Sequence, residues 1–304
     1  MRVNPVYKKE LRIRVRTVKL SLIILGYNAL LAIIGLFAFY MSFQMRGYNT
    51  ISYSNIVNIY SAIAILEFAL VIFIVPAFTA GSISGERERQ TLEIMLTSKL
   101  NPIQIILGKL ASSISTILLL VFSSLPILAI VFSVGGIRFR DLLQLMFLTF
   151  VTAVFVGSIG VFFSTLFKRT VPATVLTYGS VIALILGTVA ITSAVFMVAT
   201  WNIQKQNFGD AKIPTADLGN FLMIFLINPA VTMGSMLTKQ YGSGNVLDSF
   251  LREYGNCNQF VADNWFVISV LVQLIISAIL ILSAARILDP LKKHSKKQSK
   301  KKLE

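Results

Sequence analysis

Long apolar stretches constrain this chain more than any other feature of its sequence. Between Lys19 and Arg46 there is no charged residue, and five more predominantly apolar stretches follow. A helix needs roughly 20 apolar residues to cross the hydrocarbon core of a bilayer. The sequence therefore predicts six transmembrane helices, near residues 20–43, 56–80, 110–134, 142–167, 171–199 and 264–286.

The composition fits a chain that lies mostly in lipid. Only 13% of the 304 residues are charged, whereas a soluble domain carries roughly 25%. Because this small number of charged side chains cannot cover a globule with polar surface, much of the surface must face lipid. We therefore predict an all-α integral membrane protein with one transmembrane domain at 20–287. A segment at 1–19 precedes it, and a basic, disordered tail at 288–304 follows it.

The basic residues predict the orientation of the helices. If the N-terminus is cytoplasmic, 21 of the 28 Lys and Arg residues lie on the cytoplasmic side and seven lie on the other side. Cytoplasmic loops carry an excess of Lys and Arg, so both termini are predicted to be cytoplasmic. Basic segments that border a membrane attract anionic lipids. The net charge of +15 therefore indicates membrane lipids, and no nucleic acid, as partners.

One further apolar segment, 218–238, leaves two alternatives open. It is uncharged and long enough to be a seventh span, but a seventh span would place the basic C-terminal tail outside the cell. Asn228–Pro229 also interrupts it, since proline removes a backbone donor and biases the preceding residue away from helix. We favour two short extracellular helices that enter the membrane and return. Such re-entrant helices must be buried against protein.

The segment before the first span is predicted to be an amphipathic helix. Asn4–Pro5 is typical of a helix start, with Asn as the cap and Pro at the first position. Apolar residues such as Leu11 then share one helical face, and basic residues such as Arg12 lie on the neighbouring face. This pattern suits a helix in the membrane interface. The sequence LRIRVR also alternates with the period of a strand, so this alternative stays open.

The loop between the second and third spans contains the most informative pattern in the sequence. Glu86, Arg89, Gln90 and Glu93 can share a polar side of a short helix, while a second side is apolar, with Leu92, Met95 and Leu96. This pattern predicts one amphipathic helix on the cytoplasmic side. Asn101–Pro102 then starts a helix that continues into the third span. The amphipathic helix either transmits force from a soluble partner or is a connector that lies on the membrane.

The same segment resembles the loop that permeases of ABC-2-type transporters place between their second and third spans. That family shows small residues, then an E-R-E sequence, a T-L-E-x-L-L-like run and a G-K pair that enters the third span. The matching residues here are Gly85, Glu86, Arg87, Glu88, Thr91, Leu92, Glu93, Leu96, Gly108 and Lys109. The opening residues NPVYKKELR resemble the amphipathic elbow helix of the family, and Asn228–Pro229 resembles its extracellular re-entrant helices.

This resemblance implies a function for the chain and a role for the loop. In the family, the loop is a coupling helix seated on a separate ATP-binding subunit, so the resemblance implies such a subunit as partner, with Mg-ATP bound to the partner alone. It implies the permease subunit of a bacterial plasma-membrane exporter, paired with a second copy or with a related permease. The residues implied to couple to the ATPase are Glu86, Arg87, Glu88, Arg89, Thr91, Leu92, Glu93 and Leu96.

The sequence excludes several kinds of catalysis by this chain. A phosphate-binding P-loop needs G-x-x-x-x-G-K-[ST], but Ile103 lies five positions before Gly108, and Leu110 follows Lys109. The single histidine, His294, is in the basic tail, which excludes an H-E-x-x-H metal site and a Ser–His pair within the membrane. We therefore expect no enzyme activity, no metal and no cofactor in this chain.

Glu67 lies in the middle of the second predicted span and leaves an alternative function open. A charge at that depth costs at least ~2.5–3.5 kcal/mol, so such a residue faces a cavity or a polar partner by default. Glu67 would line the translocation path, or carry a proton in an ion-coupled secondary transporter or channel. In the structural alternative it is protonated, or hydrogen-bonded to a neighbouring Asn or Ser such as Asn28. The sequence shows no internal repeat of the kind that builds secondary transporters.

Overall fold

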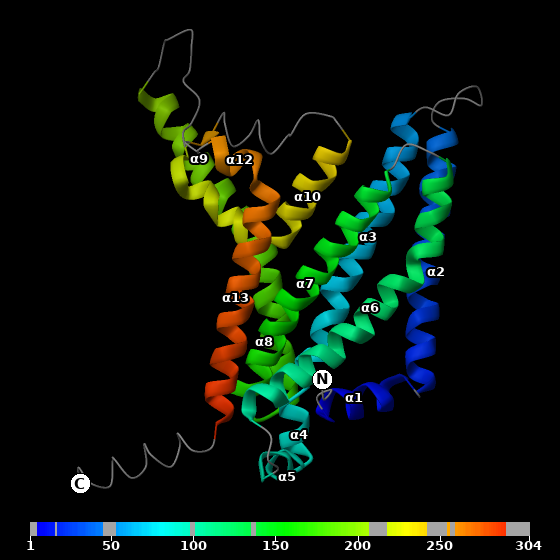
Figure 1. Cartoon of the computed structure of the whole chain (residues 1–304). Coiled ribbons are helices and arrows are strands. Elements are labelled where there is room, and N and C mark those ends of the chain that lie inside the picture. The colour runs from blue at the N-terminus through cyan, green and yellow to red at the C-terminus, as the bar shows by residue number, and fades with distance from the viewer. Residues whose placement is uncertain are drawn as a thin grey trace. The chain divides into compact units, whose positions relative to one another are not determined.

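The computed structural model of the chain describes residues 5–15, 17–44, 53–97, 101–134, 138–206, 218–241, 254–255 and 259–289. Every regular element in these ranges is a helix (Figure 1). Asn4, His294 and the basic tail from 290 onward lie outside the described residues. The chain divides into two compact units, one formed by 1–178 and 275–304 and the other by 179–274.

Within the described ranges, six helices are long and apolar enough to cross a membrane, which confirms the predicted all-α integral membrane fold. They are Val18–Met41, Val57–Glu88, Pro102–Ile130, Phe139–Leu166, Thr170–Ile203 and Trp265–Leu288. The second of these has 32 residues, and roughly 20 suffice to cross the hydrocarbon core. We therefore assign its last turns, with Glu86 and Glu88, to the region beyond the membrane.

The first unit begins with a short helix that lies across the end of a long one. Figure 1 shows α1 (Pro5–Val15) directed across the axis of α2 (Val18–Gln44). The residues of the LRIRVR sequence that are described, up to Val15, are helical, so the strand alternative is wrong for them. The Tyr7 hydroxyl lies 3.1 Å from Ser115 Oγ, which joins α1 to α6 (Pro102–Val134). The helix α1 is therefore packed against the transmembrane helices.

At the centre of the first unit, α7 (Phe139–Leu166) packs against α3 (Tyr53–Thr79) and α6. Small residues allow α7 and α3 to approach closely. A Cβ atom at Gly160 would collide with the Thr79 hydroxyl, so only glycine fits there. Close packing around small residues is a main source of helix association in lipid, where no hydrophobic force draws helices together.

The loop between α3 and α6 forms two short helices, α4 (Ser84–Glu88) and α5 (Leu92–Thr97). The prediction of one continuous helix is therefore wrong. Gln90 has a φ of 58°, and this left-handed residue ends α4. The backbone N–H of Gln90 donates to the Arg87 carbonyl, and the N–H of Thr91 donates to the Glu86 carbonyl. These two bonds form a Schellman motif, which closes a helix end.

The second unit contains the bent segment predicted between the last two spans. Its helices are the end of α8 (Thr170–Ile182), the π-helical turn Ala183–Gly187, α9 (Thr188–Gln206), η2 (Gly219–Ile227), α10 (Pro229–Gln240), α12 (Gln259–Asp263) and the start of α13 (Trp265–Leu288). The helices η2 and α10 are bent by 97° at Asn228, as a broken span or a re-entrant loop would be. Both alternatives from the sequence therefore remain open.

Asn228 is the residue that fixes this bend. Its side chain is buried, and Oδ1 accepts a hydrogen bond of 2.9 Å from the backbone N–H of Ala230, as an N-cap does. Its Nδ2 donates to the Ile185 carbonyl at 3.0 Å and to Thr188 Oγ1 at 2.7 Å. The side-chain amide of Asn228 thus caps the first turn of α10 and also links α10 to the helix that contains the π-helical turn.

Candidate functional site

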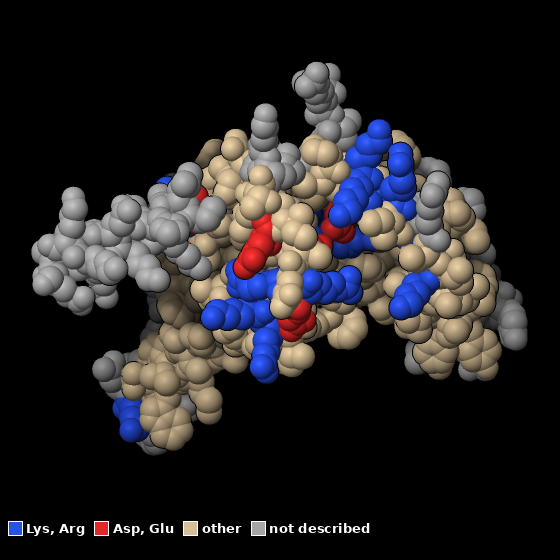
Figure 2. Space-filling model, turned by 90° about the horizontal axis from the view of Figure 1, so that it is seen from below, with Lys and Arg blue, Asp and Glu red and all other residues tan. Residues whose placement is uncertain are grey.

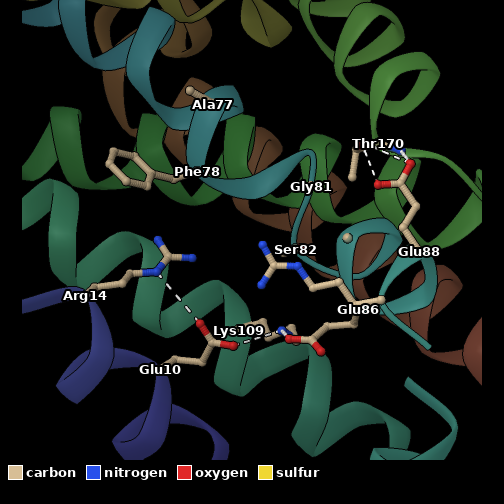
Figure 3. A pocket seen from close by; sticks show the side chains of 12 residues that line it. Glu10, Arg14, Ala77, Phe78, Gly81, Ser82, Glu86, Glu88, Lys109 and Thr170 are labelled. Carbon is tan, nitrogen blue, oxygen red and sulfur yellow. Dashed lines mark hydrogen bonds and ion pairs between the residues drawn. The ribbon is translucent and has the colours of Figure 1, made fainter. Parts of the chain in front are cut away.

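A buried lysine connects three helices of the first unit. Lys109, in α6, is only 4% exposed, and its Nζ donates to Glu10 Oε1 of α1 at 2.9 Å and to Glu86 Oε1 of α4 at 3.0 Å. Figure 3 shows the lysine between the two carboxylates. A buried ammonium group is tolerated only when it is paired and hydrogen-bonded. The Lys109 cluster, defined as Lys109, Glu10 and Glu86, therefore joins α1, α4 and α6.

Glu86 also holds the turn between α4 and α5. Its carboxylate accepts a hydrogen bond from the Thr91 hydroxyl, one residue after the left-handed Gln90. Burial raises the pKa of the Glu86 carboxyl, but the Thr91 hydrogen bond and the charge of Lys109 together lower the pKa below its ordinary value. Glu86 is therefore stabilised in its charged form by the contacts that position α4.

Arg87 and Glu88 bind the turn between α7 and α8. The Arg87 guanidinium donates to the carbonyls of Phe167 and Thr165, at 3.0 and 3.2 Å, at the C-terminal end of α7. The Glu88 carboxylate accepts from the backbone N–H of Thr170 at 2.8 Å and from its hydroxyl, at the N-terminal end of α8. The hydrogen bond from the Thr170 backbone N–H is the main cause that lowers the pKa of the Glu88 carboxyl, and the hydrogen bond from the Thr170 hydroxyl adds to it. These charges match the polarity of the two helix ends.

The start of the loop is fixed to α7 by a serine. Ser164 Oγ accepts hydrogen bonds from the backbone N–H groups of Ile83 and Ser84, at 2.8 and 3.0 Å. Leu92 is buried in an apolar cluster with Ile83 and Leu288, and Leu96 packs against that cluster. The predicted apolar side of the segment thus faces the protein, so replacing Leu92 would disturb the core.

The exposed residues of α4, α5 and their connecting turn form a separate set. They are Glu88, Arg89, Gln90, Thr91, Glu93, Ile94 and Thr97, and Ile94 is 72% exposed. Of the residues that the sequence places in the coupling segment, six contact their own chain: Glu86, Arg87, Glu88, Thr91, Leu92 and Leu96. Glu88 and Thr91 do so from exposed positions, and Arg89 and Glu93 are exposed as well. The sequence did not single out Ile94, because a short sequence segment does not show whether an apolar side chain is exposed or packed in the core.

Basic residues surround this segment on the surface of the first unit. Figure 2 shows Lys and Arg side chains around and between acidic ones on the face that contains α1, α4 and α5. The exposed basic residues of α1, of the start of α2, of the α4–α5 turn and of the α7–α8 turn are Lys8, Lys9, Arg12, Lys19, Arg89, Lys168 and Arg169. Together with α4 and α5 they give this face a mixed polar surface, in contrast to the apolar sides of the long helices.

Glu67 lies apart from this face, within α3. Its side chain is 1% exposed, and Oε1 accepts a hydrogen bond of 2.9 Å from Ser124 Oγ of α6. The sequence suggested an Asn or Ser of a neighbouring span, such as Asn28; the partner is indeed a serine of another span, while Asn28 donates to Ser123 Oγ at 2.9 Å. In this conformation Glu67 therefore has a serine partner inside the helix bundle and is not open to solvent.

The sequence did not single out the partners of Lys109. Gly108–Lys109 is the G-K pair of the motif described above, but the contact of Lys109 with Glu10 joins residues that are 99 positions apart. The sequence does contain a signal, namely a charged residue about two helical turns inside a largely apolar helix, with acidic residues in two segments that precede that helix. That signal predicts an ion pair but does not choose between the acidic residues.

Taken together, these helices define a multi-spanning membrane protein with a compact polar joint at one end. The family model described as ABC-2 family transporter protein matches residues 40–287. This match covers most of the chain, which therefore belongs to the ABC-2 family of transporter proteins. A search of curated proteins found no match to the chain. Family membership makes the chain a membrane permease, of a kind that generally pairs with an ATP-binding subunit.

Proposed function

We propose that this chain is the permease subunit of an ATP-driven exporter, powered by a separate ATP-binding subunit. Family membership and the lack of a P-loop in the sequence support this proposal. Mg-ATP binds to the partner alone. Two permeases, either two copies of this chain or one copy and a related permease, together enclose the path, since six spans form half of a twelve-helix pathway.

The observation on which the proposal mainly depends is the Lys109 cluster. It connects the elbow helix α1, the loop helix α4 and the third span α6 through one buried side chain. A load applied to α4 or α5 by a soluble partner thereby reaches two further helices without bending a flexible loop. Cores and buried polar joints transmit displacement because they are close-packed and have low compressibility.

The surface that meets the ATP-binding subunit is proposed to be a groove between α1 and α5. This groove has a volume of about 670 Å³, and its lining includes Ile13, Ile94, Met95 and Arg89. Exposed apolar side chains surrounded by charged ones are typical of the centre of a protein interface. In this proposal, Arg89, Glu93 and Ile94 contact the partner, while Glu86, Arg87 and Glu88 hold the segment in place.

Transport then follows from closure of the partner subunits on ATP. Their approach pushes on residues 86–97 of each permease, and the two permeases change from an inward-facing to an outward-facing shape. The alternative of ion coupling through Glu67, which is buried against Ser124, is not the function that family membership supports.

The proposal is tested by purification from native membranes with Ile94→Glu. Tagged wild-type protein is expected to copurify with a polypeptide that is labelled by a photoreactive ATP analogue. A buried negative charge in the groove should reduce the recovered label by at least tenfold, since a central interface residue is typically worth 2 kcal/mol or more. Thr97→Glu is the matched control, because it places the same charge on an exposed position of α5 outside the groove.

Two results would contradict the proposal at different levels. If no ATP-binding polypeptide accompanies the wild-type protein, and the reconstituted chain still moves a cargo by itself, the exporter function is wrong. If the partner is recovered equally with wild-type protein and with Ile94→Glu, the exporter function stands, but the groove is not the contact surface.

A further inference from the structure

A second pocket of the first unit lies between α1, α4 and the end of α3. Its volume is about 440 Å³, and its charged lining consists of Glu10, Glu86, Glu88, Arg14, Arg89 and Lys109 (Figure 3). All three carboxylates already have short contacts. Glu10 and Glu86 accept from Lys109, and Glu88 accepts from Thr170. The acidic side of the pocket is therefore occupied by bonds within the protein.

Arg14 is the basic residue of the pocket whose bonding is incomplete. Its guanidinium lies over the Phe78 ring, 5.3 Å from the centroid, and its Nε is 3.8 Å from Glu10 Oε2. Its Nη1 atom is buried and has no hydrogen-bond partner among the described residues. Burial lowers the pKa of Arg14, but an arginine remains charged at neutral pH. Buried donors without a partner are rare in proteins and call for an explanation.

Two further donors line the same pocket. Ser82 Oγ is buried and, within the described part of the chain, has no hydrogen-bond partner. Arg89 is exposed and contributes a second guanidinium to the lining. Two guanidinium groups and a hydroxyl form a donor set that suits a phosphate group, because arginine binds phosphate with paired, charge-assisted hydrogen bonds.

The position of the pocket favours a phosphate that belongs to a lipid. Ala77 and Phe78, in the last turn of α3, form its apolar wall. From Ala77, exposed residues follow along α3 in steps of four, at Phe73, Ala69 and Ile65. Residues four apart share one face of a helix, so an exposed strip leads from the pocket into the transmembrane part of α3. A lipid with its head group in the pocket can lay its acyl chains along this strip.

We propose that Arg14, Arg89 and Ser82 form a binding site for a phosphate group, supplied by the head group of a membrane phospholipid. The phosphate accepts from Arg14 Nη1, from the Ser82 hydroxyl and from the Arg89 guanidinium, while Phe78 covers the Arg14 side chain. Lys109 is not part of the site, because both carboxylates of its cluster hold it. A bound head group joins α1 to the turn before α4, so the site makes the joint sensitive to the lipid composition of the membrane.

The test measures lipid binding to the delipidated, full-length protein in detergent by native mass spectrometry. The probes are dioctanoyl phosphatidylglycerol, inorganic phosphate and dioctanoylglycerol, which lacks the phosphate. Wild-type protein is expected to bind the phospholipid and not dioctanoylglycerol. Arg14→Gln and Arg89→Gln should each weaken phospholipid binding by about tenfold or more, since each removes a charge-assisted hydrogen bond. Ser82→Ala should weaken it less.

The matched control is Arg12→Gln, which removes an exposed arginine of α1 that does not line the pocket. It should bind the phospholipid as the wild type does. Arg14→Lys keeps the positive charge at this position. If Arg14→Gln has the same melting temperature and monodispersity as Arg14→Lys, its weaker lipid binding does not result from lost folding. Since Arg89 is exposed, Arg89→Gln provides a variant that is expected to fold normally.

Each result supports or overturns the proposal. If inorganic phosphate competes with the phospholipid at equal concentration, the phosphate site stands and its assignment to a lipid is wrong. If dioctanoylglycerol binds as tightly as the phospholipid, or if Arg14→Gln and Arg89→Gln bind like Arg12→Gln, the site itself is wrong. None of these results depends on an ATP-binding partner, so the exporter function is tested separately.

Discussion

Lys109 shows how one side chain can determine the geometry of three helices. A lysine at 4% exposure needs partners for its charge, and Glu10 and Glu86 supply them from two separate segments that both precede it in the sequence. Both carboxylates are partly exposed, so each ion pair is weaker than a fully buried one. The pairs nevertheless act together, because removal of the lysine leaves two carboxylates facing each other.

Lys109→Met is therefore expected to destabilise the protein by about 2 kcal/mol, the usual worth of hydrogen bonds to a charged group. Methionine fills nearly the same space and keeps the helix propensity, so the loss reports the two ion pairs. The measurement is thermal unfolding of the purified protein in detergent. Lys8→Met, an exposed change on α1, is the control and should leave the melting temperature unchanged. Equal melting temperatures for both variants would show that the cluster contributes no stability.

The lowered pKa of Glu86 predicts how stability depends on pH. A carboxyl whose pKa is lower in the folded state adds stability above its unfolded value of 4.5, and this stability is lost as the pH falls through the folded pKa. The melting temperature of the wild type should therefore fall more steeply below about pH 4.5 than that of Glu86→Gln. Glu93→Gln, an exposed change on α5, is the control. Parallel curves for wild type and Glu86→Gln would contradict the prediction.

At the scale of single residues, the sequence pattern contains the charged positions of the loop but not their contacts. Glu86, Arg87, Glu88 and Lys109 were all singled out, yet their partners come from residues 23 to 99 positions away. No local pattern records such distances. Glu67 is an example, because the sequence suggested an Asn or Ser of a neighbouring span but could not select Ser124 among them.

At the scale of helices, the break between α4 and α5 is the main departure from the sequence prediction. A Schellman motif usually has glycine at the left-handed position, and here that position is Gln90. The signal that normally marks the end of a helix is thus missing. The opposite holds at Asn228–Pro229, where the proline predicted an interruption between two short helices, and η2 ends and α10 begins there.

Arg87 and Glu88 illustrate how neighbouring residues can serve two different helices. Carbonyl groups are exposed at the C-terminal end of α7, and N–H groups are exposed at the N-terminal end of α8. The positive side chain binds the first end and the negative one binds the second. The order of the two charges in the sequence therefore matters, and not merely their presence.

This order can be tested with the double change Arg87→Glu with Glu88→Arg, which keeps the composition and the net charge. Each side chain then meets a helix end of its own sign, so the melting temperature should fall clearly. Lys8→Glu with Glu93→Lys is the control, since it exchanges charges between exposed residues of α1 and α5. If both double variants melt at the same temperature, the caps have no effect on stability.

At the scale of the whole molecule, six of the spans could be predicted because each depends on local composition alone. A run of apolar residues is either long enough to cross a bilayer or it is not. The start of α6 at Pro102 was also predicted, from Asn101–Pro102. Whether 218–238 crosses the membrane was not predictable, because both a broken span and a re-entrant loop bury the same apolar residues.

Whether 218–238 crosses the membrane can be decided by measuring on which side of the membrane the C-terminus lies. We expect a reporter fused to the C-terminus to be active only if it is a cytoplasmic type, such as green fluorescent protein. Alkaline phosphatase, which is active outside the cytoplasm, should remain inactive at the same position. Six spans place both termini on one side. An active phosphatase, with a cytoplasmic N-terminus, would show that 218–238 is a seventh span.

The paired caps at Arg87 and Glu88 have a mechanical consequence. The peptide chain ties α4 and α5 to α3 and α6, whereas only side-chain bonds tie them to α7 and α8. If a partner subunit displaces α4 and α5 as proposed, α3 and α6 must follow through the peptide chain, whereas α7 and α8 follow only while these hydrogen bonds hold. The strength of these hydrogen bonds then determines how far α7 and α8 can move together with α3 and α6 before the two pairs of helices separate.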